Sequence, residues 1–204
     1  GDIISFAGGI PDGALFAYQA LLARRVEDPD DGGLVDGIAT LTKDRWISTL
    51  LRPEVFSFLS NEPARCTWAE LASAIEGPRN LIDAGGLAVM SQPNERFTAL
   101  LRSLGKGSRA EDNLDAAFLT ADSEAFDWSV RSIGHANRLL HELTPGYATD
   151  IDLVVDSIGL VDDRASFRGS SGAIHRGLIF LSPDKTWTPG IFAEEILHEG
   201  THNL

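Results

Sequence analysis

The chain has 204 residues, of which 43% are hydrophobic and 23% are charged, a balance typical of a folded globular protein. Its 17 Lys and Arg against 30 Asp and Glu leave a formal net charge of −13, which argues against nucleic acid and membrane surfaces as partners and favours a cationic peptide. The single cysteine, Cys66, cannot form an internal disulfide, and no apolar run resembles a membrane span or a signal peptide. The sequence therefore predicts a cytoplasmic protein.

Residues 1–145 are predicted to form a mainly helical region. Apolar residues recur three and four positions apart, as a half-buried helix requires, in residues 14–26, 94–105 and 126–143. Helix-breaking residues, including the Gly-Pro-Arg-Asn stretch at 77–80, divide the region into roughly six or seven helices.

Residues 146–204 have a different character and are predicted to form a strand, a loop, a second strand and a helix. Residues 151–161 and 172–182 are rich in β-branched and large apolar side chains, which favours strands. The second strand is apolar on both faces, as expected of a strand covered on each side. The last helix is predicted to begin with Thr188 as N-cap and Pro189 in its first turn, and to run to the end of the chain. No sharp boundary separates the two regions, which we expect to form one continuous domain.

The last helix carries a His-Glu-x-x-His motif formed by His198, Glu199 and His202. On a helix the two histidines lie one turn apart, so both imidazoles leave the same face and can bind one metal ion. Glu199 can then take a proton from water at the open position of the ion, its role in metal hydrolases with this spacing. Glu195, one turn before His198, is a candidate acceptor for a hydrogen bond from an imidazole N–H. A helix whose histidines are merely solvated is the simpler alternative.

A metal site with two imidazoles needs a third protein ligand, which in metalloproteases usually follows the motif in the chain. Only Asn203 and Leu204 follow it in this sequence, and a helix that ends so soon after its ligands is expected to fray. We therefore expect the third ligand to lie beyond Leu204, and the chain to be the N-terminal portion of a longer protein. A ligand from upstream is the alternative.

Three stretches of the C-terminal region, IDLVVDSIGLV, SFRGSSGAIHRGLIFLSP and FAEEILHEGTHNL, together resemble a family of bacterial peptide-modifying proteins. These are the 2-oxoglutarate-dependent peptide β-hydroxylases associated with clusters for ribosomally made, post-translationally modified peptides. The resemblance implies a non-haem Fe(II) held by His198, His202 and a third ligand, with 2-oxoglutarate and O₂ as co-substrates. Three protein ligands on one side of the ion leave three positions free, two for 2-oxoglutarate and one for O₂. The role of Glu199 stays open in this family, because hydroxylation needs no base that activates water.

Binding of 2-oxoglutarate also requires a cation for its distal carboxylate, and a bidentate arginine is the usual solution. Arg168 and Arg176 are the arginines nearest in sequence to the second strand and the metal helix, and are the candidates for this role. His175 is a candidate to face the metal from the second strand, with a structural histidine as the simpler interpretation.

Other polar residues with chemical potential favour structural interpretations. His135 and His141 are predicted to lie on different sides of the 126–143 helix, at the surface. The Ser170-Ser171-Gly172 stretch lacks the lysine and the spacing of a phosphate-binding loop, and is predicted to be a flexible turn.

The sequence thus predicts an α+β fold in which a mainly helical N-terminal portion precedes a strand-loop-strand unit and a zincin-like metal-binding helix. The predicted function is Fe(II)- and 2-oxoglutarate-dependent hydroxylation of a β-carbon in a precursor peptide. The first alternative is a zinc metallopeptidase, with Glu199 as general base and the 172–182 strand pairing with its substrate. The second is a non-catalytic peptide-binding protein that keeps the helix only as a scaffold.

Overall fold

The computed structural model describes residues 79–92, 117–165, 167–171 and 177–203, with the isolated residues 19, 20, 49, 50, 52 and 55. Cys66, His175 and Arg176 lie outside the described residues, as do the helix predicted at 94–105 and most of the helix predicted at 14–26. The helical character expected of those parts of the chain stays a prediction.

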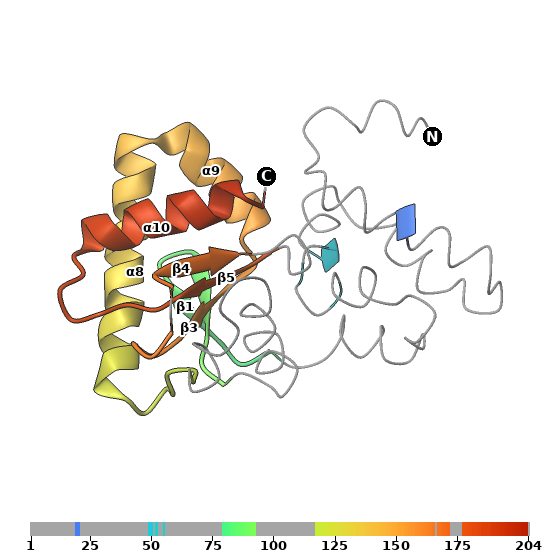
Figure 1. The fold of residues 1–204 in the computed structure, drawn as a ribbon. Coiled ribbons are helices and arrows are strands. Elements are labelled where there is room, and N and C mark those ends of the chain that lie inside the picture. Colours follow the sequence, from blue (N-terminus) through green and yellow to red (C-terminus); the bar gives the residue numbers. More distant parts are fainter. Residues whose placement is uncertain are drawn as a thin grey trace, which may run out of the picture.

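The described residues build a five-stranded mixed sheet (Figure 1). Its strands are β1 (Leu81–Ala84), β2 (Leu87–Met90), β3 (Ser157–Leu160), β4 (Gly169–Ser171) and β5 (Leu178–Leu181), and their spatial order is β1-β2-β3-β5-β4. The central strands β2, β3 and β5 are parallel, whereas β1 and β4 are antiparallel to their neighbours at the two edges. The sheet therefore unites strands from both sides of residue 145.

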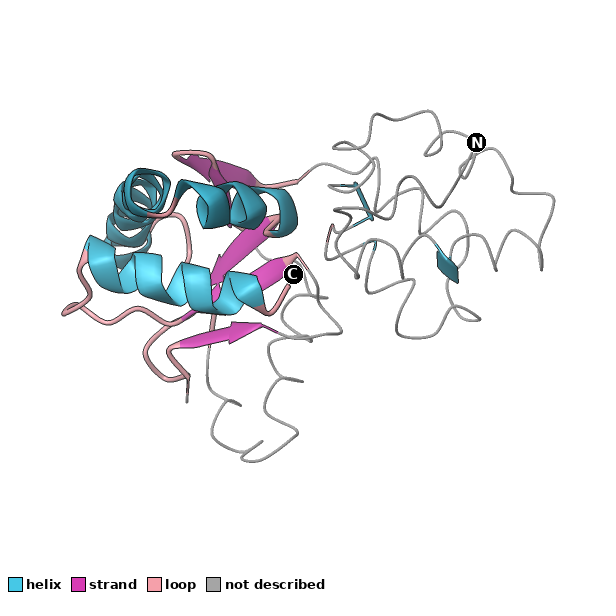
Figure 2. Cartoon of the chain, turned by 90° about the horizontal axis from the view of Figure 1, so that it is seen from above, coloured by secondary structure: helices cyan, strands magenta, loops and turns pink. Residues whose placement is uncertain are grey.

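Three described helices, α8 (Glu124–Leu143), α9 (Pro145–Val154) and α10 (Pro189–Thr201), pack on one face of this sheet (Figure 2). α8 lies against β1 and β2, α10 lies against β4 and β5, and the two helices contact each other. α8 confirms the helix predicted at 126–143, with the Ser123 hydroxyl accepting from Phe126 N–H as its cap (3.2 Å). The predicted mixed α and β class is confirmed, and none of the described helices has the length and apolar character of a membrane span.

The alternation of side chains along β5 explains why both of its faces are apolar. Ile179 and Leu181 join the main core beneath the helices, whereas Leu178 and Phe180 lie with Met90 in a smaller cluster on the other face of the sheet. All four side chains of the strand are buried. The prediction of a strand covered on both sides is confirmed for this part of the second predicted strand.

Residues 81–90 form a β-hairpin, so the helical character predicted there is wrong. Gly85 and Gly86 occupy the turn with φ values of 71° and 104°, a conformation that other residues rarely adopt. The Gly86 N–H also donates to Oδ1 of Asp83 at 2.8 Å. A Gly-Gly pair between two short apolar runs is a hairpin signal, and it outweighs the helical spacing of the neighbouring sequence.

The first part of the strand predicted at 151–161 is also wrong, because α9 extends to Val154. This helix buries Ala148, Ile151 and Val154, which recur three positions apart on one side. Only the segment from Ser157 onwards forms β3. The β-branched residues near the junction resemble a strand by composition, but packing of the apolar side of α9 against α8 and α10 decides in favour of a helix.

Candidate metal centre

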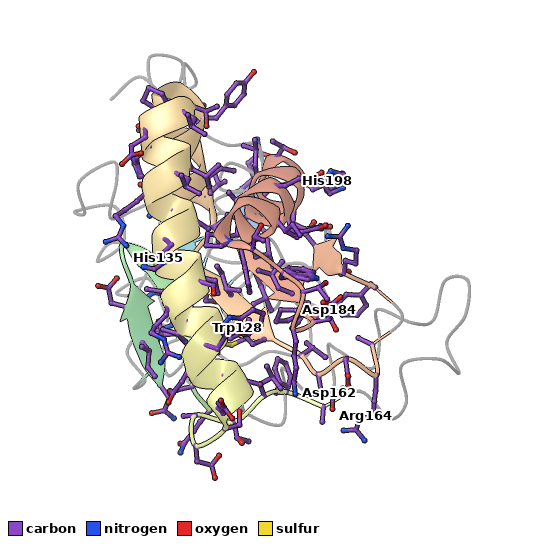
Figure 3. The ribbon with its side chains drawn as sticks, turned by 90° about the vertical axis from the view of Figure 1, so that its left-hand side faces the viewer. Trp128, His135, Asp162, Arg164, Asp184 and His198 are labelled. Atoms are coloured by element: carbon purple, nitrogen blue, oxygen red, sulfur yellow. The ribbon has the colours of Figure 1, made fainter. Side chains whose placement is uncertain are left out.

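α10 begins as predicted, with Thr188 as its N-cap and Pro189 at its first position. The Thr188 hydroxyl accepts from Ile191 N–H at 3.4 Å, and Pro189 has no N–H that would need a partner there. One side of the helix, which includes Phe192 and Ile196, is buried in the main core. Figure 3 shows His198 on the outer side of α10, away from α8.

His198 and His202 lie close together on the exposed side of this helix. Their Nε2 atoms are 3.4 Å apart. Two imidazole nitrogens bound to one ion stand about 2.9–3.4 Å apart, for metal–nitrogen distances of roughly 2.0–2.1 Å and angles of about 90–110° at the metal. α10 ends at Thr201 rather than at the end of the chain, but His202 keeps a helical backbone (φ −68°, ψ −13°) and hence the one-turn spacing. The pair therefore has the geometry of two ligands of one metal ion.

A third ligand does not accompany this pair in the part of the chain that the structure describes, where no three His, Cys, Asp or Glu side chains are grouped to hold a metal. Oε1 of Glu199 is 3.9 Å from Nε2 of His198, farther than neighbouring ligands of one ion stand apart. Glu199 thus lies beside the ion position without the spacing of a ligand. The third ligand expected beyond Leu204 stays a prediction.

The carboxylate of Glu199 is buried, although it follows the exposed His198 directly. The Glu199 side chain is 8% exposed, compared with 65% for His198. Ser171 in β4 donates its hydroxyl to Oε2 of Glu199 at 2.6 Å. A buried carboxylate needs such a donor, because removing it from water without a hydrogen bond is strongly unfavourable. The sheet therefore holds the glutamate of the motif in place.

The strand β4 stands where a flexible turn was predicted around Ser170 and Ser171, so that prediction is wrong. In the register of the antiparallel pair, Gly169 lies opposite Leu181 and Ser171 lies opposite Ile179. Those two β5 residues face the helices. Gly169 and Ser171 consequently face α10, and Ser170 faces the other way.

Asn203 connects the end of α10 to the sheet. Its side chain is buried, with Oδ1 accepting from Gly177 N–H at 2.9 Å and Nδ2 donating to the Glu199 carbonyl at 3.1 Å. The second bond satisfies one of the carbonyl groups that the end of a helix leaves without a partner. These bonds remove the reason to expect fraying directly after the motif. The sequence offered no signal for them, because an asparagine near a helix end is common at any surface.

Two arginines were predicted as candidates to bind the co-substrate carboxylate. Of these, Arg168 lies within the described residues, immediately before β4. Its Nε is 3.4 Å from Oε1 of Glu195, and its guanidinium carbon is 5.2 Å from the centroid of the Trp187 ring. The two contacts hold a guanidinium whose side chain is still 59% exposed. Glu195 therefore pairs with Arg168 and does not accept the hydrogen bond that was predicted from an imidazole of the motif.

The connector between β5 and α10 is ordered by local hydrogen bonds. The side chain and the backbone N–H of Thr186 donate to Asp184 and lower the pKa of its carboxyl group, with smaller contributions from Arg168 and Trp187. Asp184 is thus held ionised at neutral pH, in the segment that leads to the N-cap of α10.

The histidines of α8 lie at the surface, as predicted. His135 is exposed and is labelled on α8 in Figure 3. Nε2 of His141 is 2.8 Å from Oδ2 of Asp152 in α9, with both side chains partly exposed. Neither histidine joins the pair on α10.

Gly200, which lies between Glu199 and His202, packs against α9. A Cβ atom at this position would be 2.3 Å from Cδ1 of Ile151, whose side chain is fully buried. We expect Gly200→Ala to lower the free energy of unfolding by about 1–3 kcal/mol through overpacking. Urea denaturation of the metal-free chain measures this change.

The variant Ile151→Val is the matched test of that contact, because it removes the Cδ1 atom. Alone it is expected to cost about 0.5–1.5 kcal/mol. Combined with Gly200→Ala it should restore part of the lost stability, since the two residues are in contact and their effects are not additive. Strictly additive losses would contradict the proposed clash.

Comparisons with known proteins do not place the chain in a family, because no family model and no curated protein matches it.

Proposed function

We propose that the chain carries the metal centre of a divalent-metal enzyme, in which a sheet and a zincin-like helix position the ligands. The observation that carries this proposal is the 3.4 Å separation of the Nε2 atoms of His198 and His202 on the exposed side of α10. Within this class, the protein is proposed to be an Fe(II)- and 2-oxoglutarate-dependent enzyme that hydroxylates a β-carbon of a ribosomally made precursor peptide. The resemblance of the C-terminal region supports this second step.

His198 and His202 would hold the iron through their Nε2 atoms, together with a third ligand that the described residues do not include. When bound, Fe(II) would activate O₂ as the oxidant, with two electrons from the conversion of 2-oxoglutarate to succinate and CO₂ and two from the C–H bond that is hydroxylated. Arg168 is proposed to pair with the distal carboxylate of 2-oxoglutarate, because a planar guanidinium matches a carboxylate. Glu195 already neutralises part of this charge, so the co-substrate must share the guanidinium or displace Glu195 from it.

The proposed substrate is a peptide with basic residues. The net charge of −13 attracts such a peptide and repels polyanions. The 65% exposure of the His198 side chain is compatible with a macromolecular substrate, which could not enter a closed cavity. The cytoplasm, where a ribosomally made peptide is synthesised, is the proposed location.

Anaerobic loading of the full-length protein with Fe(II), followed by 2-oxoglutarate, tests the proposed chemistry. We expect a visible absorption band that requires both components and, after admission of O₂, conversion of 2-oxoglutarate to succinate and CO₂. A basic precursor peptide should then gain the mass of one oxygen atom. Iron binding without the band and without consumption of 2-oxoglutarate would rule out this chemistry. Failure to bind any divalent metal would favour a peptide-binding protein without catalysis.

The placement of Glu199 favours zinc metallopeptidase activity as a second candidate function. Its carboxylate is buried beside the histidines and held by Ser171, a position suited to a general base, whereas hydroxylation requires no such base. Peptide cleavage by the zinc-loaded chain that falls by about 10²–10⁴-fold in Glu199→Gln would support this function. Cleavage should also be independent of 2-oxoglutarate, which separates the two candidates.

Arg168→Ala is expected to raise the dissociation constant of 2-oxoglutarate for the Fe(II)-loaded protein by about 10- to 100-fold, because the variant loses a hydrogen bond to a charged group. The intensity of the visible band during a 2-oxoglutarate titration measures it. Arg164→Ala is the matched control, since Arg164 is similarly exposed and lies in the same β3–β4 connection but pairs with Asp162. Equal affinities in both variants would remove Arg168 from the proposed site.

A further inference from the structure

We propose that Ser171 is a positioning residue that fixes the orientation of the Glu199 carboxylate, with one oxygen bound to the sheet and the other toward the histidines of α10; this inference rests on the metal centre proposed at His198 and His202. The Ser171 hydroxyl donates to Oε2 of Glu199 at 2.6 Å, whereas Oε1 lies 3.9 Å from Nε2 of His198. One carboxylate oxygen is thus bound to the strand and the other lies on the side of the histidine. The first distance falls in the range of hydroxyl bonds to carboxylates, about 2.5–2.7 Å.

β4 contributes to this contact at two alternate positions, both of which face α10. A Cβ atom at Gly169 would lie 2.9 Å from Oε2 of Glu195, 2.9 Å from Cγ of Glu199 and 3.0 Å from Oε1 of Glu199, so a larger residue would displace both side chains. Glycine therefore lets the strand approach the helix, and Ser171 supplies the hydrogen-bond donor at the next position on the same face.

A glutamate on a helix samples several rotamers when its carboxylate has no partner. The bond from Ser171 selects the rotamer that keeps Oε2 against the sheet and Oε1 toward His198. In a hydrolase, Oε1 would accept the proton of the attacking water. In a hydroxylase, the same oxygen would accept a hydrogen bond from an N–H or O–H group of the peptide substrate beside the ion.

Carbodiimide coupling of glycine ethyl ester to the metal-free, 204-residue chain tests the contact without relying on activity. Peptide mass spectrometry measures labelling of Glu199. We expect labelling to rise about tenfold in Ser171→Ala, because a hydrogen bond to a charged group no longer holds the carboxylate. Ser170→Ala, on the opposite face of the strand, should leave it unchanged, and Ser171→Thr, which keeps the hydroxyl, should restore protection.

Labelling of Glu195 on the same helix is the internal reference for local unfolding. An equal rise at both glutamates in Ser171→Ala, or no rise at Glu199, would overturn the positioning role. If Ser171→Ala does not fold, Ser171→Cys replaces it, because a thiol is of similar size but a weak donor. The same rise at Glu199 is then expected.

Titration with Co(II) separates this inference from the proposed metal centre. Ser171→Ala should bind Co(II) with nearly the affinity of the unaltered protein, because the Ser171 hydroxyl bonds to Glu199 and not to a histidine of the pair. Its turnover number should fall, whereas the KM of the co-substrate or peptide should stay the same. Absence of Co(II) binding to the unaltered full-length protein would reject the metal centre, and with it the positioning of Glu199 toward an ion. Unaltered metal affinity and turnover in Ser171→Ala would reject the positioning role alone.

Discussion

Alanine at His198 or at His202 is expected to weaken divalent-metal binding by more than about 100-fold, because even the loss of a group that only supports a ligand costs 10–100-fold. The two Nε2 atoms stand 3.4 Å apart on one helix, so each variant leaves a single imidazole at the site. Calorimetry with Zn(II), or the ligand-field absorption of Co(II), measures the affinity.

His135→Ala is the control for this experiment, because His135 is an exposed histidine on α8 that belongs to no metal-ligand group among the described residues. It should retain the metal affinity of the unaltered chain. Since both motif histidines are exposed, neither alanine variant should change the stability of the metal-free protein by more than about 0.5 kcal/mol. Equal metal affinity in all three variants would place the metal elsewhere and reject the proposed centre.

Asn203→Ala is expected to destabilise the metal-free protein by about 2–4 kcal/mol, because it removes a buried side chain and leaves the Gly177 N–H without its acceptor. The same change releases the Glu199 carbonyl at the end of α10. We therefore also expect metal affinity to fall by about tenfold, since His202 directly precedes the lost anchor. Urea denaturation and Co(II) titration measure the two effects.

Asn137→Ala separates these two effects. Asn137 is also a buried asparagine, but it lies in α8 and donates to the Gly85 carbonyl at 2.8 Å, in the hairpin turn. It should reduce stability and leave metal affinity unchanged. The role of Asn203 as the anchor of α10 would be rejected if Asn203→Ala changed the free energy of unfolding by less than about 0.5 kcal/mol. It would also be rejected if Asn203→Ala and Asn137→Ala weakened metal binding equally.

The accuracy of the sequence predictions depended on how far apart the interacting residues lie. The cap of α10 by Thr188, the first-turn position of Pro189 and the alignment of the two histidines are confirmed, since each involves residues within one or two helical turns. The hairpin at Gly85 and Gly86 also has a local signal, but it was missed because residues 1–145 were predicted as one mainly helical region. α9 was missed for a different reason, because β-branched composition near a helix end also suits a strand.

Amino-acid order alone specifies the face of α10 that carries both histidines, because a one-turn spacing places two imidazoles together wherever a helix forms. Tertiary structure alone specifies what surrounds that face. Ser171 and Glu199 are 28 positions apart in the chain, and Gly177 and Asn203 are 26 apart. Their pairing depends on the register of β4 and β5, and a shift of one residue would turn Ser171 to the other side of the sheet. Local spacing thus aligns the two histidines. The packing of the edge strand β4 against α10, in contrast, buries the carboxylate of Glu199 between strand and helix.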